Sequence, residues 1–431
     1  MDQSASIWAH CLQHAAKSDQ GLRRANNQDS LAVALASSQE SFQQRGHLFV
    51  VADGMGAHAA GELASRIATG AVPLTYHKLL DRSPPEALFQ AVLDANNQIH
   101  SRGQASPDFR GMGTTCTVLA VLPQGALLAH AGDSRAYRLR GSRLEQLTFD
   151  HSLVWEMRRA GQLPDDALPG YISKNIITRS LGPNPAVQVD LEGPFPIEVG
   201  DMFLLCSDGL SGQVKDEEIG AVLMCLPPEE AVQTLIDLAN LRGGPDNITV
   251  IVARLTGPQV AQGAAPKPEA AVAPSRARPV PPLVWTLLGV FGLAALGFLV
   301  LDYVLLALLS VGAAVLTGVV AWAQRISSAG GGLYFGGRPL GRGPYVACDC
   351  TPNAQIVVRL KDIVEQLRDA AAHEDWTVDW HGFNGYLREA AAATTAADYA
   401  QATRQYLHAL SFIMGELKRQ RPPEGDSAVN L

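Results

Sequence analysis

The sequence predicts an α/β fold in which two mainly antiparallel sheets pack in the middle and helix pairs cover them on the outside. Helical patterns occur in pairs between the β-type runs, whereas a doubly wound parallel sheet would alternate single strands with single helices. The segment "LAVLPQGALLAH" is typical of an antiparallel hairpin that turns at Pro123, Gln124 and Gly125. With 431 residues, 47% of them hydrophobic, the chain is long enough for two or three domains.

Residues 1–256 are expected to form one globular domain, because its elements follow one another without a long polar break. The expected strands are the apolar runs 31–36, 47–53, 115–122, 126–139, 201–208 and 247–255. The expected helix pairs are 61–80 with 84–102, and 215–225 with 227–242.

Charge and cysteine content exclude several classes of protein. The formal net charge is −8 and no strongly basic segment stands out, so we expect no nucleic-acid partner. Among the six cysteines only Cys348 and Cys350 are close in sequence, and a C-x-C pair without a second pair is weak evidence for zinc. Reduced thiols facing the cytosol are favoured. The first residues lack the charged-then-apolar layout of a signal peptide.

The middle of the chain predicts a membrane segment. Residues 257–282 are rich in proline and alanine and are expected to be a linker. Residues 283–323 are apolar except for Asp302, and about 20 apolar residues cross a bilayer once. Arginines flank the run on both sides, which favours a helical hairpin, 283–301 and 303–323, with both ends in the cytoplasm. One long tilted span that buries Asp302 is the costlier alternative. We therefore expect a multi-pass protein of the inner, cytoplasmic membrane, with lipid as a partner.

The last part of the chain suggests no chemistry. Residues 324–352 are expected to be a glycine-rich tether, and residues 353–420 to form a small helical C-terminal region. Trp376, Trp380 and Phe383 occur at helical spacing, which is far more typical of packing than of a ligand site. Neither a role for this region nor an oligomeric state follows from the sequence.

Four aspartates stand next to predicted strands of the first domain. Asp53 ("VVADGMG"), Asp133 ("LLAHAGDSR") and Asp208 ("FLLCSDGLSG") follow apolar runs, and Asp246 ("GGPDNITVIV") precedes one. Each alone is more commonly a turn or cap. Together, converging carboxylates would repel by about 4 kcal/mol per pair at 4 Å and an effective dielectric of 20. A divalent cation removes that cost, and oxygen-only ligands favour Mg²⁺ or Mn²⁺ over zinc. Two such ions can activate a water for attack on phosphorus.

A phosphoryl substrate also needs a cationic partner. The stretch "RRANNQDS" offers Arg23 and Arg24, and a guanidinium can bind phosphate oxygens through two parallel hydrogen bonds. By itself, a surface pair of arginines is more commonly a solvated charge.

Eight stretches follow one another in a characteristic order: "RRANNQDS", "VVADGMGAHAAGELAS", "GMGTTCTVLAV", "AGDSRAYRLR", "LTFDHSL", "ITRSLG", "LLCSDGLSG" and "GGPDNITVIV". In them, residues 20–256 resemble the bacterial metal-dependent protein phosphatases of the 2C type. The resemblance implies an α-β-β-α sandwich and a serine/threonine phosphatase that uses Mn²⁺ or Mg²⁺. It also implies phosphoprotein substrates, made by a serine/threonine kinase.

The resemblance assigns roles to the acidic residues. Asp53 matches the carboxylate that bridges two core ions, and Gly54 supplies a carbonyl to one of them. Asp208 and Asp246 match ligands of the second ion. Asp133 matches the ligand of a third, weaker ion that shares Asp208. Asp53 and Asp208 are therefore expected to be catalytic as well as metal-binding.

The resemblance also assigns residues around the metal ligands. Arg24 matches the catalytic arginine that binds the substrate phosphate. Gln28 and Asp29 match positions that hold metal-bound waters, and Asn247 is expected to order the Asp246 loop. Residues 150–185 match a mobile flap, in which Lys174 is a candidate for substrate contact.

Two departures from the family pattern affect the expected site. Ala57 replaces the last glycine of the usual "GMGG", which we expect activity to tolerate. Met55 stands where many eukaryotic members carry a histidine, so the acid for the leaving group is unassigned. His58 and His151 lie near the site by motif, with a structural role favoured for both. The competing hypothesis is a catalytically inert phosphoprotein-binding or scaffold protein; inert relatives typically lose metal aspartates, and none is lost here.

Overall fold

The computed structural model describes residues 11–56, 59–163, 176–257, 260, 282–301, 303–328, 334–335, 338–341, 343–373 and 376–420. The chain divides into two compact units, one of residues 1–265 with 342–431 and one of residues 266–341. Ala57, His58, Lys174 and Asp302 lie outside the described residues.

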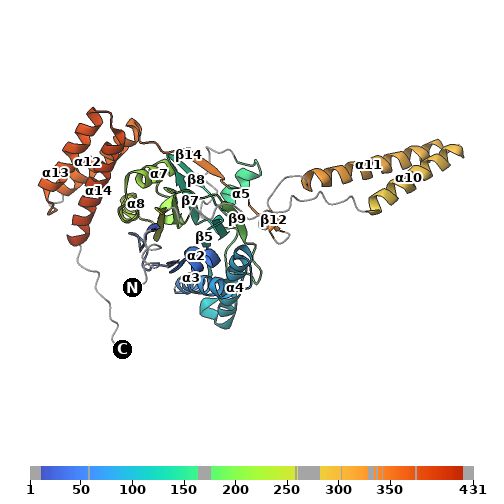
Figure 1. The fold of residues 1–431 in the computed structure, drawn as a ribbon, viewed down its shortest axis with the longest axis horizontal. Helices are drawn as coiled ribbons and strands as arrows, with labels where there is room; N and C mark the ends of the chain where they lie inside the picture. The colour runs from blue at the N-terminus through green and yellow to red at the C-terminus, as the bar shows by residue number, and fades with distance from the viewer. Residues whose placement is uncertain are drawn as a thin grey trace. The chain divides into compact units, whose positions relative to one another are not determined.

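Two antiparallel sheets form the centre of the larger unit, each with six strands among the described residues (Figure 1). The first sheet has the order β1 (Leu12–Asp19), β11 (Ile248–Leu255), β10 (Met202–Cys206), β7 (Arg135–Arg140), β8 (Arg143–Gln146) and β14 (Val346–Asp349). The second has the order β2 (Asp29–Ala34), β3 (His47–Met55), β5 (Cys116–Leu122), β6 (Gly125–Ala131) and β9 (Asp190–Phe195), with β4 (Gly113–Thr114) paired to β3. The pairings within both sheets are antiparallel, which confirms the predicted fold class.

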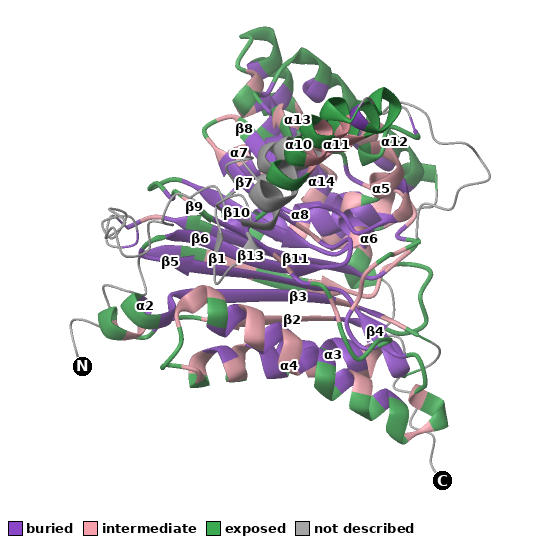
Figure 2. Ribbon diagram, turned by 90° about the vertical axis from the view of Figure 1, so that its right-hand side faces the viewer, coloured by how far each residue is buried: buried purple, intermediate pink, exposed green. Residues whose placement is uncertain are grey.

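Helix pairs cover the outer faces of the two sheets (Figure 2). α3 (Ala60–Lys78) and α4 (Pro84–Ala105) pack on the second sheet, and α7 (Asp216–Cys225) and α8 (Pro228–Leu241) pack on the first. Shorter helices are α2 (Gln39–Arg45), α5 (Leu153–Arg159), α6 (Asp208–Ser211) and the 3₁₀ helix η1 (Pro107–Phe109). Between the sheets lies a core that includes Phe49, Leu119, Phe203 and Ile251. This arrangement leaves the strand ends free to carry polar side chains.

The predicted strand 126–139 is in fact two strands in different sheets. β6 ends at Ala131 and β7 begins at Arg135, and the chain passes between the sheets in the three residues Gly132, Asp133 and Ser134. Gly132 has φ 125°, and a Cβ there would lie 2.5 Å from the Cβ of Thr115. Glycine is therefore required at this crossing. Apolar periodicity alone cannot reveal a break of this kind.

The C-terminal segment belongs to the larger unit. β14, which lies within the stretch expected to be a glycine-rich tether, pairs with β8 at the edge of the first sheet. It is followed by α12 (Ala354–His373), α13 (Trp380–Thr395) and α14 (Tyr399–Gln420), and α14 packs against both α7 and α8. The hydrophobic core of the first sheet continues into these helices through buried side chains such as Ile356 and Leu407. Trp376 and Trp380 also pack against this core, and Phe383 is fully buried.

Polar contacts reinforce the packing of α14. The Lys418 ammonium lies 2.9 Å from a carboxylate oxygen of the buried Asp237. Arg404 donates a hydrogen bond to the carbonyl of Cys225 at 2.9 Å. Because α8 contacts the sheet on one side and α14 on the other, almost all of its residues are buried.

The smaller unit contains the apolar run. Helices α10 (Pro282–Val300) and α11 (Val304–Ser328) pack against each other, and β12 (Tyr334–Phe335) pairs with β13 (Arg338–Pro339). Among the described residues, no helix combines the length and the apolar character needed to cross a membrane. The transmembrane part of the predicted fold is therefore not supported.

A buried carboxyl joins the C-terminal segment to the second sheet. Glu192 on β9 is 1% exposed, and it accepts hydrogen bonds from the backbone of Gly343 at 3.1 Å and from the Tyr345 hydroxyl. Burial raises the pKa of Glu192 to about 7, although both hydrogen bonds act in the opposite direction. The ring of Tyr345 also packs against Phe149.

We predict that Glu192→Gln removes part of the pH dependence of stability. Because the folded-state pKa of Glu192 is raised, the wild-type protein loses stability as pH rises from about 4.5 to about 7, and it stays less stable above that range. The variant should match the wild type near pH 4.5 and exceed it at pH 8 by up to about 3 kcal/mol. Urea unfolding at both pH values measures this difference. An equal effect of the substitution at both pH values would contradict the prediction.

Candidate active site

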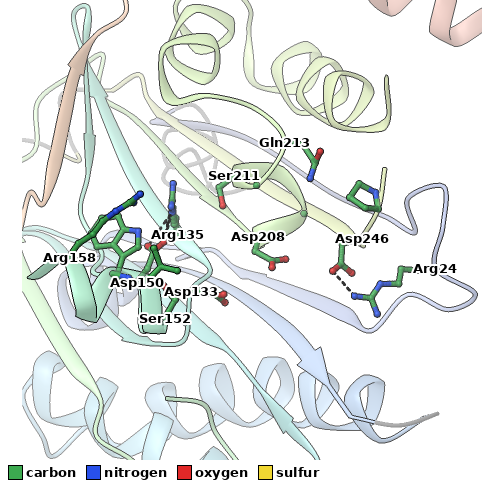
Figure 3. Close-up of a pocket in the computed structure, with 15 residues that line it drawn as sticks. Arg24, Asp133, Arg135, Asp150, Ser152, Arg158, Asp208, Ser211, Gln213 and Asp246 are labelled. Atoms are coloured by element: carbon green, nitrogen blue, oxygen red, sulfur yellow. Dashed lines mark hydrogen bonds and ion pairs between the residues drawn. The ribbon is translucent and has the colours of Figure 1, made fainter. Parts of the chain in front are cut away.

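The strand-end aspartates border one cavity of about 740 Å³ (Figure 3). Asp208 is the first residue of α6, immediately after β10, and Asp246 lies just before β11. Asp133 lies in the crossing between β6 and β7. In Figure 3 the carboxylates of these three residues point into the same space. Antiparallel pairing explains the arrangement of Asp208 and Asp246, because the last residues of β10 pair with the first residues of β11.

Asp53 comes from the other sheet and reaches the same site. It lies on β3 directly opposite Asp29 of β2. The side chain of Asp53 lowers the pKa of Asp208 and the charge of Asp208 raises the pKa of Asp53, so carboxyls from the two sheets interact. The predicted convergence of Asp53 with Asp208 is therefore present in the structure.

Burial and mutual repulsion raise the pKa values of these carboxyls. For Asp53, burial comes first and the charges of Asp29, Asp208 and Asp133 follow, and its pKa lies well above the usual range. Burial and the charge of Asp208 raise the pKa of Asp133 to about 8. Burial raises the pKa of Asp29 to about 7, against hydrogen bonds from Thr249 and Ser207. Burial and Asp246 raise the pKa of Asp208.

The chemistry of this set of aspartates fits a cation-binding role. One oxygen each of Asp29, Asp133 and Asp208 is buried and has no hydrogen-bond partner within the described part of the chain. A buried carboxylate without a partner is costly, and a bound cation satisfies several at once. Within the described residues, no group of three or more His, Cys, Asp or Glu side chains is arranged so that it could hold a metal ion. The aspartates thus surround a shared space without a preformed three-residue centre.

Arg24 stands at the rim of the cavity. Its guanidinium lies 2.6 Å from a carboxylate oxygen of Asp246, and about half of the side chain is exposed. The hydrogen bond to Asp246 raises the pKa of Arg24, and the charges of Asp53 and Asp208 add to this. Figure 3 shows this ion pair as a dashed line. The arginine therefore faces the acidic residues, with room to reach an anion that enters from solvent.

Asn247 ties the loops around the site together. Its side-chain amide donates to the carbonyls of Gln20 and Asn26 at 2.9 and 3.0 Å, and its side-chain oxygen accepts from the backbone of Gln28 at 2.8 Å. The carbonyl of Gln28 accepts from the backbone of Gly54 at 3.1 Å. Asn247 thus links the Asp246 loop to the residues that precede β2, as the sequence analysis expected.

Asp29 is held by a neighbour that the sequence analysis missed. Ser207, the residue before Asp208, donates a hydrogen bond to Asp29 at 2.7 Å and is fully buried. Its hydroxyl also accepts from the backbone of Thr249 at 2.9 Å. One serine therefore connects β2, β10 and β11 beneath the cavity.

The far wall of the cavity also consists of residues that the sequence analysis left without a role. Arg135 binds Asp150 through Nε, at 2.9 Å from the nearer carboxylate oxygen, and its guanidinium lies 5.7 Å from the ring centre of Trp155. Arg158 lines the same wall. The only signal in the sequence was the position of Arg135 and Asp150 beside two matched motifs.

His151 stabilises the turn that carries Asp133 without lining the cavity itself. It is fully buried and is not among the described residues that line the cavity. Its Nδ1 accepts from the backbone of Gly132 at 3.0 Å, and its Nε2 lies 2.9 Å from Asp190. These contacts fix the turn that carries Asp133, which favours the structural role for His151.

Comparison with known proteins decides the family. Residues 22–235 match the model of a family described as Protein phosphatase 2C. The chain is also 39% identical over 236 residues to Protein phosphatase PhpP of Streptococcus pneumoniae, an alignment that covers 54% of this chain and 93% of the relative. This chain belongs to the protein phosphatase 2C family.

Solved structures agree with this assignment. The serine/threonine phosphatase of S. agalactiae is 34% identical, with a TM-score of 0.50 over 57% of this chain and 99% of the other. The catalytic domain of the serine/threonine protein phosphatase PstP, solved in complex with two manganese ions, is 37% identical, with a TM-score of 0.47 over 57% of this chain and 99% of the other.

We predict that Asn247→Ala destabilises the protein by about 1–3 kcal/mol, because it removes three hydrogen bonds and leaves the buried backbone groups of Gln28 and Gln20 unpaired. Urea unfolding measures the effect. Asn97→Ala, at an exposed position of α4, is the matched control and should stay within about 0.5 kcal/mol of the wild type. Equal stabilities of the two variants would contradict this account of the Asp246 loop.

Proposed function

We propose that this protein is a metal-dependent phosphatase that hydrolyses phosphoserine and phosphothreonine in proteins. The observation that carries the proposal is the placement of Asp133, Asp208 and Asp246 around one cavity, with Asp53 of the other sheet interacting electrostatically with Asp208. Membership of the phosphatase 2C family and the names of its relatives support the same reaction. The substrates would be phosphoproteins produced by a serine/threonine kinase.

The proposed metals are Mn²⁺ or Mg²⁺, two at the core and a third more weakly held. When bound, such ions lower the pKa of a coordinated water and polarise the phosphoryl group. Asp53, Asp208 and Asp246 would hold the core ions, with the carbonyl of Gly54. Asp133 would hold the third ion together with Asp208. Hard oxygen ligands suit these cations, and the unpartnered carboxylate oxygens of Asp133 and Asp208 support the assignment.

Arg24 would bind and orient the phosphate. Its guanidinium already lies beside the acidic group, so a bound phosphate could accept two parallel hydrogen bonds from it while the ester faces the carboxylates. The residues around the proposed metal ligands would be kept in position by the hydrogen bonds described above for Gln28, Asp29 and Ser207. Among the described residues that line the cavity none is a histidine, so protonation of the leaving group is left to solvent in this proposal.

The competing hypothesis is an inert copy that binds phosphoproteins without hydrolysis. An inert copy has no need to keep Asp53, Asp133 and Asp208, whose pKa values are raised by desolvation and mutual repulsion. Every aspartate expected to bind metal is present in this chain. The two hypotheses differ in a measurable property, since only the enzyme requires divalent metal for turnover.

We predict that Asp208→Asn lowers phosphate release from a phosphothreonine peptide by at least about 100-fold, because it removes a charge shared by several metal positions. The full chain is assayed with and without added Mn²⁺. Asp108→Asn, at an exposed position of η1, is the control and should keep wild-type activity. Metal-independent turnover by the wild type, or full turnover by Asp208→Asn, would refute the proposal.

Calorimetric titration with Mn²⁺ separates the two hypotheses further. The enzyme should bind at least two ions, and Asp208→Asn should bind fewer with lower affinity. A wild-type protein that binds no pair of Mn²⁺ ions would support the inert alternative.

We propose separately that residues 283–323 attach the protein to the cytoplasmic membrane, with the phosphatase domain in the cytoplasm. This proposal rests on the run of residues 283–323, which is apolar except for Asp302, and on the exposed side chains of α10 and α11, such as Leu293 and Leu305, which are 73% and 74% exposed. Exposed apolar surface of this kind needs a cover in water, and lipid supplies one.

We predict that the full chain sediments with membranes and resists extraction at alkaline pH, whereas a variant without residues 283–323 stays in the supernatant and keeps metal-dependent phosphatase activity. Cell fractionation followed by the phosphopeptide assay on both fractions measures this. A full chain that remains in the supernatant, or that an alkaline wash releases, would contradict membrane attachment.

A further inference from the structure

Cys348 and Cys350 form a close pair of thiols on β14 and just after it. Their sulfur atoms lie 3.5 Å apart, and neither is part of a disulfide in the structure. Residues two apart in a strand project to the same side, so the extended backbone brings both sulfurs together. β14 is the edge strand of the first sheet, with Cys348 opposite Leu144 of β8. The pair is thus held by a ladder that involves neither sulfur.

The two thiols have different surroundings. Cys348 is partly exposed, whereas Cys350 is fully buried. A hydrogen bond from the Cys350 thiol lowers the pKa of Cys348, and the same bond, together with burial, raises the pKa of Cys350. A partly exposed thiolate reacts with oxidants, and a neighbouring protonated thiol can resolve the product. By contrast, burial raises the pKa of Cys116 and of Cys206 to about 12, which disfavours their reaction.

Cys350 packs tightly against helix α7. A Cβ on Gly220 of α7 would lie 2.1 Å from the Cys350 sulfur, so glycine is required opposite this thiol. The same sulfur lies 3.7 Å from the carbonyl of Asp216, and the backbone of Cys350 donates to the carbonyl of Ser142 at 2.8 Å. The buried member of the pair therefore contacts the first turn of α7 directly.

A chain of contacts joins this turn to the cavity. The carboxylate of Asp216 accepts a hydrogen bond from the Tyr137 hydroxyl at 3.0 Å. Arg135 donates to the same hydroxyl at 2.9 Å and lines the cavity. Cys350 is thus linked to a residue of the cavity wall through Asp216 and Tyr137.

We propose that Cys348 and Cys350 are a reversible oxidation site that closes to a disulfide on reaction with a hydroperoxide and lowers the activity of the neighbouring active site. The part of this proposal that concerns activity rests on the proposed phosphatase function. The part that concerns disulfide formation is independent of that function.

The chemistry balances with one hydroperoxide per pair. The Cys348 thiolate attacks the terminal oxygen, the O–O bond breaks, and an alcohol or water leaves, which makes a sulfenic acid at Cys348. The Cys350 thiol then attacks the Cys348 sulfur, the S–S bond forms, and water leaves. Two thiols are oxidised to one disulfide, and the hydroperoxide is reduced to an alcohol, or water, and water.

The geometry favours a reversible bond. A disulfide requires an S–S distance of about 2.05 Å, so the sulfurs must approach each other by about 1.5 Å. Cα atoms two residues apart in a strand are separated by about 6.7 Å, at the upper end of the range that disulfides span. Such a bond is strained and easily reduced. Its formation would draw the Cys350 sulfur away from the Asp216 carbonyl and loosen the contacts that lead to Arg135.

Oxidation of the full chain with hydrogen peroxide, followed by blocking of free thiols and tryptic digestion, tests the chemistry. Cleavage after Arg342 and Arg359 releases residues 343–359, which contain these two cysteines and no other. We expect this peptide unalkylated and lighter by two hydrogen atoms after oxidation, and doubly alkylated after a further treatment with a dithiol reductant. A doubly alkylated peptide after oxidation, or Cys348 that proceeds to sulfinic acid without a disulfide, would overturn the proposal.

Single variants distinguish the attacking thiol from the resolving one. In Cys350→Ser, Cys348 should be trapped as a sulfenic acid by a dione reagent, and in Cys348→Ser no such adduct should form. The reverse pattern would overturn the assigned roles. Both serine substitutions are nearly isosteric, and thermal unfolding of each variant verifies its fold.

Phosphate release, measured on the same samples, tests the effect on the active site. Oxidised wild type should lose at least about half of its metal-dependent activity and recover it after reduction, while oxidised Cys350→Ser should keep its activity. A disulfide that forms without any change in activity would overturn the link to the cavity. Because the peptide masses do not depend on catalysis, failure of the phosphatase assignment would leave the disulfide result intact.

Discussion

Repulsion among buried carboxyls is the constraint on which the rest of this structure depends. Asp29 and Asp133 are buried, Asp53 and Asp208 are partly buried, and each has a raised pKa because desolvation and neighbouring carboxylates disfavour its charge. Partly or fully buried carboxylates destabilise a fold unless another interaction compensates for their lost hydration. The two-sheet fold makes the arrangement possible, because its interlocked strands hold the backbone of each aspartate through pairings that do not involve the carboxyls. The apolar core between the sheets therefore supplies the stability that offsets the repulsion among these carboxyls.

Neutral donors and one internal arginine stabilise the surroundings of these carboxyls. Ser207 donates to Asp29, Asn247 connects three loops, and the backbone of Gly132 donates to His151. Arg135 is paired with Asp150 in the cavity wall, so its charge is already partly satisfied. Arg24 differs from Arg135, because it is half exposed and pairs only with Asp246 in the described contacts. This difference explains why Arg24 is suited to an incoming anion and Arg135 to a fixed structural pair.

The sequence predicted what depends on local pattern, and it did not predict what depends on distant partners. Apolar runs gave most of the central strands, and small residues beside aspartates indicated which strand ends carry the site. β14 was missed because its four residues acquire a strand partner only through β8, about 200 residues earlier. The crossing at Gly132 was missed because residues 126–139 were interpreted as one strand, although Gly132, Asp133 and Ser134 interrupt the apolar pattern. Asp150 and Arg135 define a cavity wall only after their strands pair, and Ser207 gave no signal of its own.

The C-terminal helices change the pattern of buried and exposed residues in the helix pair that covers the first sheet, α7 and α8. In a two-sheet sandwich with helices outside, α8 would show one apolar face and one polar face. Here its buried residues include Asp237, which is paired with Lys418 of α14. The phosphatase relative PhpP aligns with only 54% of this chain, so these helices lie beyond the shared region, yet they continue the same hydrophobic core. A segment outside the family match is therefore part of the unit that carries the active site, and it packs directly on α7 and α8.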